Sequence, residues 1–374
     1  MKIFFPLEVF YPSQAGGPAN TVYWLAKNLS ERGFEPTIVA TDKGLNGSVE
    51  LNEWVETAAG RTIYVKTRFL HVPLWQTLIA LPNVLRSDVI HLSSVFFPTA
   101  FNVGILARLL KKPLAWSPRG ELSIYSLNYS GRRKRPILWM LKKLIGTYPL
   151  FHSTSPEESE DIRRTFGKDA RVVLIPNYVE FDTVSTRQAA NYLLYIGRLH
   201  PKKAVDNLIE AAARSEAFLS SNYTLKIAGK GKPGYEESLR SLVSKLNLEG
   251  KVRFEGQVEG AAKDQLLANA KFTFMPSHSE NFGIVVLESL AQGTPVVASL
   301  HTPWSLLEKE RAGFVTGNSP EELSDIMNRV LKMDEAEYEA YRERGKMIVR
   351  RDFDIKNNIG KWLDFYDQLG GRSC

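Results

Sequence analysis

Cysteine is almost absent from this sequence of 374 residues, because its one cysteine, Cys374, is also its last residue. No disulfide can form within the chain, and we expect a reducing compartment, the cytoplasm. Long apolar runs are also missing: the best candidate, 70–85, is interrupted by two prolines and by polar side chains, so we expect no helix that spans a bilayer. Because Pro6, Glu8 and Pro12 follow the N-terminal apolar stretch at once, we expect no signal peptide.

The composition is not extreme in any respect. Apolar residues make up 44% of the chain and charged residues 24%, which is typical of a globular protein and excludes a disordered or collagen-like one. The 48 lysines and arginines outnumber the 41 acidic residues, for a net charge of +7. This excess is modest and no basic motif with interleaved aromatic residues occurs, so we expect no nucleic acid as partner. The length suggests two domains of roughly 150 residues or more each.

Short apolar runs alternate with helical stretches along the chain, for example with amphipathic helices expected over 19–32 and 205–214. The runs are apolar on both faces, which is typical of a parallel sheet covered by helices. In the first half the expected strands are 3–7, 37–41, 63–65, 88–95, 114–117 and 151–154, and in the second half they are 192–196, 225–228, 252–255, 272–275 and 296–299.

The alternation pauses at Ile175-Pro176-Asn177 and a polar segment follows. We therefore predict an N-terminal domain at 1–182 and a second domain at 183–352. Two successive series of this kind predict an α/β protein with two doubly wound, Rossmann-like domains, which bind ligands at the carboxyl ends of their strands. The last segment, 353–374, is expected to be a helix that crosses back to the first domain and buries aromatic residues around Trp362.

Two of the loops between a strand and a helix are candidates for binding phosphate through glycine or cations. Gly16-Gly17 precedes the first helix and offers backbone N–H groups there, although a tight turn explains this pair equally well. The loop that opens with Gly197 carries Arg198 and Lys203, a pair of cations that suits a diphosphate. A solvated basic turn is the alternative for this second loop.

A third loop, Gly229-Lys230-Gly231-Lys232-Pro233-Gly234, matches the G-x-G-x-x-G pattern of dinucleotide-binding proteins. On this motif rests an alternative function, that of an NAD-dependent oxidoreductase. However, the loop follows the second expected strand of its domain rather than the first, and Pro233 stiffens the turn. We therefore interpret Gly229 as part of a tight turn near the ligand.

A fourth loop carries Glu280 and leads into a helix that contains Glu288 and ends at Gly293. The first N–H groups of this helix, at 283–285, form a site for an anion. Eight residues turn a helix by about 800°, which leaves the two glutamates ~80° apart. They cannot act as a pair, and we expect them to accept hydrogen bonds from separate hydroxyl groups of one ligand.

Together these motifs resemble the retaining nucleotide-sugar glycosyltransferases of the GT-B fold, in family 4, also called group 1. The segments Thr302-Pro303-Trp304 and Ser117-Pro118-Arg119-Gly120 resemble the bacterial branch that builds surface polysaccharides and lipopolysaccharide. The resemblance covers nearly the whole chain and rests on Gly16-Gly17, Ile175-Pro176-Asn177, Gly197-Arg198-Leu199 with Lys203, Val252–Gly256, 280–288 and 293–297.

The resemblance implies two Rossmann-like domains that face a central cleft, the first for the acceptor and the second for the donor. It implies transfer, with retention, from a UDP-sugar, or less commonly a GDP-sugar, to a glycan or a lipid-linked acceptor. No cofactor and no metal ion is implied, in agreement with a sequence in which no His, Asp and Glu residues have the spacing of metal ligands.

The resemblance also assigns roles to residues. Arg198 and Lys203 would hold the diphosphate and stabilise the charge on the leaving group. Glu280 would bind hydroxyls of the transferred sugar, and Glu288 would bind the ribose. The other residues implied to bind the donor are Gly16, Gly17, Gly197, Gly229, Gln257, Asn281, Phe282, Gly283, Ile284 and Val285.

The sequence departs from the family pattern in two places. Ala204 follows Lys203 where glycine is usual. The histidine that many relatives place after a strand of the first domain is missing from the loop 116–120, where Arg119 is the candidate to take over part of its catalytic role. His91 lies within an expected strand, where a core histidine is commoner than a catalytic base.

A basic run at 132–135 is continuous with an apolar helical segment that contains Trp139. Such a helix, here 132–145, can lie on an anionic membrane. An ordinary helix of the first domain with a solvated basic end explains the pattern equally well. Because the family often uses lipid-linked acceptors, we expect peripheral contact with the inner face of the plasma membrane.

Overall fold

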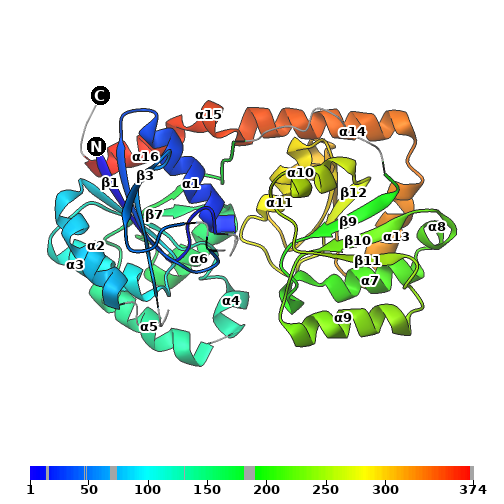
Figure 1. Cartoon of the computed structure of the whole chain (residues 1–374), viewed down its shortest axis with the longest axis horizontal. Coiled ribbons are helices and arrows are strands. Elements are labelled where there is room, and N and C mark those ends of the chain that lie inside the picture. Colours follow the sequence, from blue (N-terminus) through cyan, green and yellow to red (C-terminus); the bar gives the residue numbers. More distant parts are fainter. Residues whose placement is uncertain are drawn as a thin grey trace. The chain divides into compact units, whose positions relative to one another are not determined.

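The computed structural model describes residues 1–13, 17–45, 47, 49–67, 74–129, 131–180 and 190–370. The chain divides into two compact units, which we call unit 1 (1–180 and 354–374) and unit 2 (181–353). Each unit is a mostly parallel β-sheet with helices packed against it (Figure 1). The predicted α/β class with two doubly wound domains is therefore confirmed. In the described part of the chain, no helix combines the length and the apolar character that crossing a membrane requires.

Unit 1 contains an eight-stranded sheet in the order β3-β4-β2-β1-β5-β6-β7-β8. Neighbouring strands are parallel, except that β3 and β4 are antiparallel. The order reverses between β1 and β5, and ligands of such sheets bind at the carboxyl ends of the strands at this point. The strands are β1 Lys2–Leu7, β2 Glu35–Thr41, β3 Trp54–Thr57, β4 Gly60–Val65, β5 Val89–Ser93, β6 Leu114–Ser117, β7 Leu150–Ser153 and β8 Val172–Leu174.

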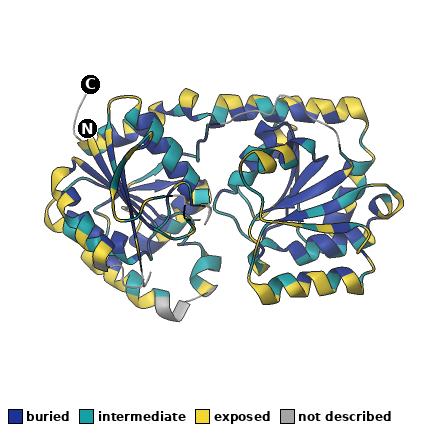
Figure 2. Ribbon diagram, in the orientation of Figure 1, coloured by how far each residue is buried: buried dark blue, intermediate teal, exposed yellow. Residues whose placement is uncertain are grey.

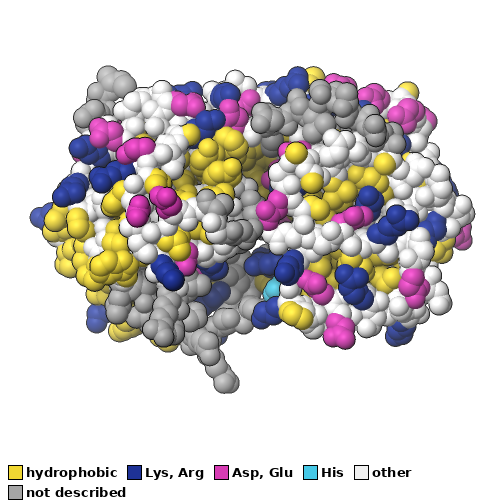
Figure 3. Space-filling view, viewed as in Figure 1, with side chains coloured by type: hydrophobic (Ala, Val, Ile, Leu, Met, Phe, Trp, Pro, Cys, Tyr) yellow, Lys and Arg dark blue, Asp and Glu magenta, His cyan; other side chains and the backbone are white. Residues whose placement is uncertain are grey.

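The core of unit 1 lies on both faces of this sheet, as the buried strands in Figure 2 show. Successive side chains of a strand point to opposite faces, so Phe5 packs with α1 and α16 while Phe4 packs with α2 and α3. Apolar side chains also gather on the outer surface over α2 and α3 (Figure 3). The helices are α1 Gly17–Ser30, α2 Leu74–Arg86, α3 Pro98–Leu109, α4 Ile124–Tyr129, α5 Gly131–Leu144, α6 Pro156–Phe166, α15 Ile355–Asn358 and α16 Gly360–Gly370.

The C-terminal segment completes unit 1. Trp362, Phe365 and Tyr366 of α16 are buried in the cluster that contains the inner face of β1. The segments that leave and re-enter unit 1 run side by side, because the N–H of Ile355 donates to the carbonyl of Val179 over 3.2 Å. The aromatic residues expected to need a surface thus fill the core of the first unit.

Unit 2 contains a six-stranded parallel sheet in the order β11-β10-β9-β12-β13-β14, which reverses between β9 and β12. The strands are β9 Tyr192–Ile196, β10 Thr224–Ala228, β11 Val252–Gly256, β12 Phe272–Met275, β13 Val296–Ser299 and β14 Gly313–Thr316. The helices are η1 Pro201–Lys203, α7 Val205–Arg214, α8 Glu216–Ser220, α9 Pro233–Lys245, α10 Gly260–Asn269, α11 Ile284–Ala291, α12 Leu306–Lys309, α13 Pro320–Leu331, α14 Glu335–Ile348 and η2 Val349–Phe353.

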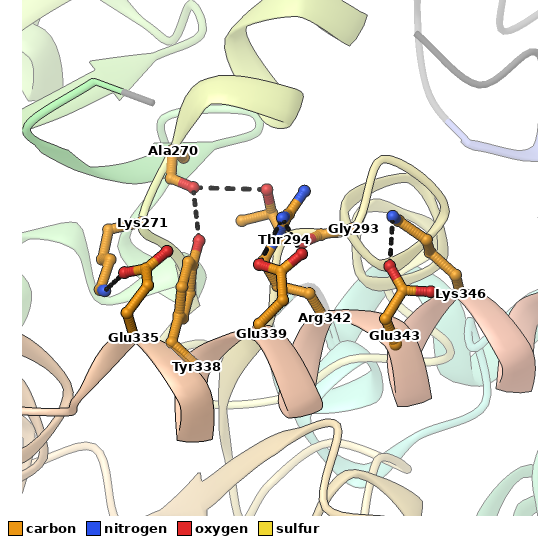
Figure 4. Close-up of polar contacts among 10 residues, drawn as sticks. All are labelled: Ala270, Lys271, Gly293, Thr294, Glu335, Tyr338, Glu339, Arg342, Glu343 and Lys346. Atoms are coloured by element: carbon orange, nitrogen blue, oxygen red, sulfur yellow. Dashed lines mark hydrogen bonds and ion pairs between the residues drawn. The ribbon is translucent and has the colours of Figure 1, made fainter. Parts of the chain in front are cut away.

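Helix α14 holds the segments that lead into β12 and β13 (Figure 4). Tyr338 donates from its hydroxyl to the carbonyl of Ala270 over 3.3 Å, and Arg342 Nε donates to the carbonyl of Gly293 over 2.8 Å. Gly293 has φ +75°, a backbone conformation that favours glycine at this helix end. The end of α11 and the amino ends of both strands are thereby held against α14.

Candidate functional site

The predicted residues Lys203 and Glu280 are in direct contact at the point where the sheet order of unit 2 reverses. Lys203 follows β9 at the end of η1, and Glu280 lies in the loop after β12. Lys203 Nζ donates to Glu280 Oε1 as an ion pair, and Ser277 Oγ donates to the same oxygen over 2.8 Å. The two loops are also joined through the backbone, since the N–H of His278 donates to the carbonyl of Lys202 over 2.9 Å.

The ion pair decides the charge of Glu280. Burial alone would raise the pKa of this carboxyl, but the positive charge and hydrogen bond of Lys203, together with the Ser277 hydroxyl, hold the pKa below its ordinary value. Glu280 is therefore an ionised acceptor at neutral pH. Arg198 is exposed on the same loop as Lys203, and its side chain has no hydrogen bond or ion pair with the described residues. Of the two predicted cations, Lys203 is thus paired and Arg198 is available.

The glycines of the G-x-G-x-x-G motif serve the packing of two loops. A Cβ on Gly229 would lie 1.9 Å from the carbonyl oxygen of Gly197, and a Cβ on Gly231 would lie 2.3 Å from that of Leu199. The third glycine, Gly234, lies in α9 with no atom within 4 Å of the Cβ position. The motif therefore has a structural cause that involves no dinucleotide, and Gly229 lies beside the loop of Arg198.

The loop that leads into α11 is fixed by the packing of Gly283 and Phe282. Gly283 is the N-cap of α11 with φ +79°, and a Cβ there would lie 2.7 Å from Met275 Sδ. The ring of Phe282 is buried against Phe353 and against Trp304, whose ring centroid lies 5.2 Å away. The backbone carbonyl of Phe282 accepts a hydrogen bond from Trp304 Nε1. The ring and the carbonyl of Phe282 are therefore committed to packing and hydrogen bonding within unit 2. Ile284 begins the helix.

Glu288 has a partner of its own, as its eight-residue distance from Glu280 predicts. Lys263 Nζ of α10 donates to Glu288 Oε1 over 2.6 Å. No sequence signal pointed to Lys263, since a single lysine in a helix has no distinguishing neighbours. Of the remaining predicted donor residues in unit 2, Asn281 and Val285 are half-buried next to these groups, and Gln257 is exposed after β11, where its amide donates to Glu259.

In unit 1, His91 is a core histidine within a chain of hydrogen bonds. His152 Nε2 faces the carbonyl of Ile175 at 2.8 Å, so it carries the proton and Nδ1 accepts from the Ser117 hydroxyl over 2.8 Å. The Ser117 oxygen then accepts from His91 Nε2 over 2.8 Å, and His91 Nδ1 accepts from the Tyr366 hydroxyl over 2.7 Å. Burial lowers the pKa of His91 far below its ordinary value. Both nitrogens of the neutral ring are used, which rules His91 out as the base.

Arg119 lies directly after β6, at the carboxyl edge of the sheet of unit 1. Arg119 Nε donates to Ser93 Oγ over 3.3 Å, and Nη1 donates to Asn177 Oδ1 over 3.1 Å. Gly17 is the first residue of α1, whereas Gly16 lies outside the described residues. Within the described part of the chain, no cluster of three His, Cys, Asp or Glu residues is arranged to hold a metal ion.

Comparisons with known proteins identify the family of this chain. The model for group 1 glycosyl transferases matches residues 180–347, and the model for glycosyltransferase family 4 matches residues 15–183. Two adjoining family models thus account for both domains, and the chain belongs to the glycosyltransferases of family 4 and group 1.

Curated relatives match part of the chain. D-inositol 3-phosphate glycosyltransferase of Thermobifida fusca is 33% identical over 150 residues, which are 37% of this chain and 34% of that protein. The O-antigen chain mannosyltransferase RfbU of Salmonella typhimurium is 28% identical over 207 residues, which are 54% of this chain and 56% of that protein. The matched segments therefore span about a third to just over half of these relatives.

Solved structures match the whole chain in fold. Sucrose-phosphate synthase from Thermosynechococcus elongatus has a TM-score of 0.81 and 20% identity, with all of both chains covered. HepE from Anabaena, in complex with UDP and glucose, has a TM-score of 0.77 and 20% identity, again with all of both chains covered. The fold is GT-B, as the sequence motifs predicted.

Proposed function

We propose that this chain is a retaining glycosyltransferase that moves a sugar from a UDP-sugar, or from a GDP-sugar, to a glycan or lipid-linked acceptor. We place the reaction in the cytoplasm, in the assembly of bacterial cell-surface polysaccharide or lipopolysaccharide. The observation that carries the proposal is the contact of Lys203 with the ionised Glu280 where the sheet order of unit 2 reverses. Support also comes from HepE, solved with UDP and glucose, and from the relative that is an O-antigen chain mannosyltransferase.

In this proposal the cations of one loop serve the leaving group. Arg198 forks onto diphosphate oxygens and Lys203 acts as a point charge, so the charge that grows as the sugar leaves is stabilised without a metal ion or cofactor. Glu280 accepts hydrogen bonds from hydroxyls of the sugar, and Glu288 does so from the ribose. Arg119 is the candidate catalytic residue of unit 1. The acceptor attacks on the face that the diphosphate leaves, which retains the anomeric configuration.

A screen of UDP- and GDP-sugars for hydrolysis and transfer, repeated with EDTA, tests the proposal. We expect turnover of one nucleotide sugar, unchanged by EDTA, with NMR showing the anomeric configuration of the donor in the product. Thermal stabilisation by NAD(H) and by no UDP or GDP compound would refute the proposal in favour of an oxidoreductase. An inverted product would refute retention alone.

We further propose that α5 contacts an anionic membrane. Trp139 of this helix is 63% exposed, and Lys143 lies over its ring at 5.3 Å. The end of α5 is tied to α3, because Arg108 Nη1 donates to the carbonyl of Leu144 over 2.7 Å. Trp139 and Lys143 lie four residues apart on one face of α5, and Leu109 at the end of α3 is also exposed. Such a surface suits the boundary between lipid headgroups and acyl chains.

Flotation with vesicles tests this contact. We expect the protein to float with vesicles that contain anionic lipid, and to do so less when Trp139→Ser is combined with Lys142→Glu and Lys143→Glu. Exposed cations elsewhere supply the matched control, Lys245→Glu with Arg253→Glu in unit 2. Equal flotation of the α5 variant and the wild type would contradict the proposal.

A further inference from the structure

We propose that the acceptor substrate carries a phosphate or carboxylate group, and that Arg119 and Asn177 of unit 1 bind this oxyanion. The inference rests on the proposed function, in which unit 1 binds the acceptor, and it adds the chemical class of that acceptor. It comes from a cation that the fold half-buries without an anion in contact with it.

Arg119 is only partly satisfied by the protein. Its two hydrogen bonds go to neutral oxygens, Ser93 Oγ and Asn177 Oδ1, and no carboxylate among the described residues lies within 4.0 Å of its guanidinium. A guanidinium has five N–H donors, so three remain. Burial lowers the pKa of Arg119, which is the direction expected when a charged form is desolvated without a contacting counter-ion.

The nearest acid is already committed to the backbone. Glu158 is 3% exposed, and its Oε1 accepts from the N–H of Gly120 over 2.6 Å. Its Oε2 accepts from the N–H of Thr154 over 2.8 Å and from the Thr154 hydroxyl over 2.9 Å. Glu158 therefore stabilises the loop of Arg119 and acts on the guanidinium only at a distance. A half-buried cation in this state gains from an anion that binds it.

Asn177 adds a second donor to the same place. Because its Oδ1 accepts from Arg119, its NH2 group points the other way, and this group has no acceptor among the described residues. His91 and His152 are neutral and use all their nitrogens in the buried chain, so they supply no anion. The site offers N–H donors from two planar groups and no free acceptor, which suits an oxyanion.

The unpartnered N–H groups of Arg119 are not fully enclosed by the protein. Among the described residues, a few side-chain atoms are both enclosed and without a hydrogen-bond partner, and the Arg119 nitrogens are not among them. Arg119 as a whole is half-buried. The position is also where a ligand of unit 1 is expected, since Ser93 ends β5 at the reversal of the sheet order. The diphosphate of the donor has its own cations, Arg198 and Lys203, in unit 2.

A charge variant of nearly unchanged shape tests the proposal. Asn177→Asp places a carboxylate next to Arg119, where it takes the place of the bound oxyanion. Arg119→Gln removes the cation. Binding of inorganic phosphate and of acetate is measured by calorimetry at constant ionic strength, with UDP at saturation so that the diphosphate site of unit 2 is occupied. Arg163→Gln, an exposed arginine of α6, is the matched control.

We expect the wild type and Arg163→Gln to bind one of the two anions, and the affinity to fall about tenfold or more in both site variants. Asn177→Asp should also melt at a higher temperature than the wild type without anion, which a folding defect cannot mimic. Anion affinity that is equal in all four proteins, or binding that UDP abolishes in the wild type, would overturn the proposal. Failure of sugar transfer leaves these measurements unaffected, so the two proposals fail separately.

Discussion

Lys203 and Glu280 form an ion pair across 77 residues of sequence, and this pair joins the two loops that flank the reversal of the sheet order in unit 2. It keeps the pKa of Glu280 below its ordinary value in spite of burial, and it leaves Lys203 next to the start of α7. In the proposed function, a bound diphosphate would share Lys203 with Glu280, and the carboxylate would turn its second oxygen to a sugar hydroxyl. In the proposed function, the pair would link recognition of the leaving group to recognition of the sugar.

Glu280→Gln should lower kcat by about a hundredfold or more, because a neutral amide cannot hold Lys203 and is a weaker acceptor for a sugar hydroxyl. Melting temperature and circular dichroism should show a folded protein. Glu343→Gln is the control, since Glu343 is exposed and paired with Lys346 on the surface. Similar kcat values for the two variants would refute the role of Glu280.

Stability of unit 1 should fall as pH drops from 6.5 toward 3. Burial, followed by the charge of Arg119, lowers the pKa of His152 from 6.5 to about 3, so the unfolded chain takes up a proton that the folded chain refuses. The free energy of unfolding should therefore lose up to about 1.4 kcal/mol per pH unit from this residue. Calorimetry between pH 7.5 and 5 measures the change.

His152→Gln isolates the histidine from other titrating groups. Its amide can still accept from Ser117 and donate to the carbonyl of Ile175, but it does not titrate. The pH dependence should become shallower in this variant than in the wild type. An unchanged slope would mean that His152 does not cause the loss.

Two glycines of one motif should respond in opposite directions. Gly229→Ala forces the loop of Gly197 away and should cost about 1–3 kcal/mol of stability and weaken donor binding. Gly234→Ala adds a methyl group to a helix in open space and should be neutral or stabilising by about 0.5–1 kcal/mol. Thermal melting and UDP binding provide the comparison. A large loss of stability or UDP affinity in Gly234→Ala would contradict the structural cause given for the motif.

Trp362→Ala should destabilise unit 1 by about 3–5 kcal/mol, since the side chain is 4% exposed in its core. The unfolding transition of unit 2 should stay where it is, because no residue of α16 belongs to that unit. Lys361→Ala, an exposed neighbour, is the control. Calorimetry that shows both transitions shifted, or neither, would contradict the assignment of the C-terminal helix.

Most of the strands could be predicted because a buried parallel strand has a continuous run of apolar residues in the sequence. The three that the sequence did not reveal lie at the edges of their sheets: β3 and β8 are half-exposed, and β14 has only four residues. An edge strand is covered on fewer sides, so its pattern is short and mixed. Edge position therefore favours omission but does not decide it, since β11, also an edge strand, was predicted from the sequence.

The sequence revealed single residues of the site but not the contacts between them. Lys203 and Glu280 could be named from their loops, but their contact could not, because it depends on which strands are neighbours. Lys263 and Ser277 carried no signal for the same reason. Asn177 was visible as part of a motif, but its partner Arg119 lies 58 residues away in sequence.

The return of the chain to unit 1 has a consequence for biosynthesis. Residues 1–180 leave the ribosome first, yet the core that they form lacks Trp362, Phe365 and Tyr366 until nearly the whole chain has been made. During synthesis the first unit therefore exposes an apolar surface for as long as translation of the second unit takes, at roughly 5–20 residues per second. The domain that begins the chain is the last to be finished, so a message truncated before α16 yields a folded unit 2 beside an open unit 1, a natural substrate for chaperones and proteases.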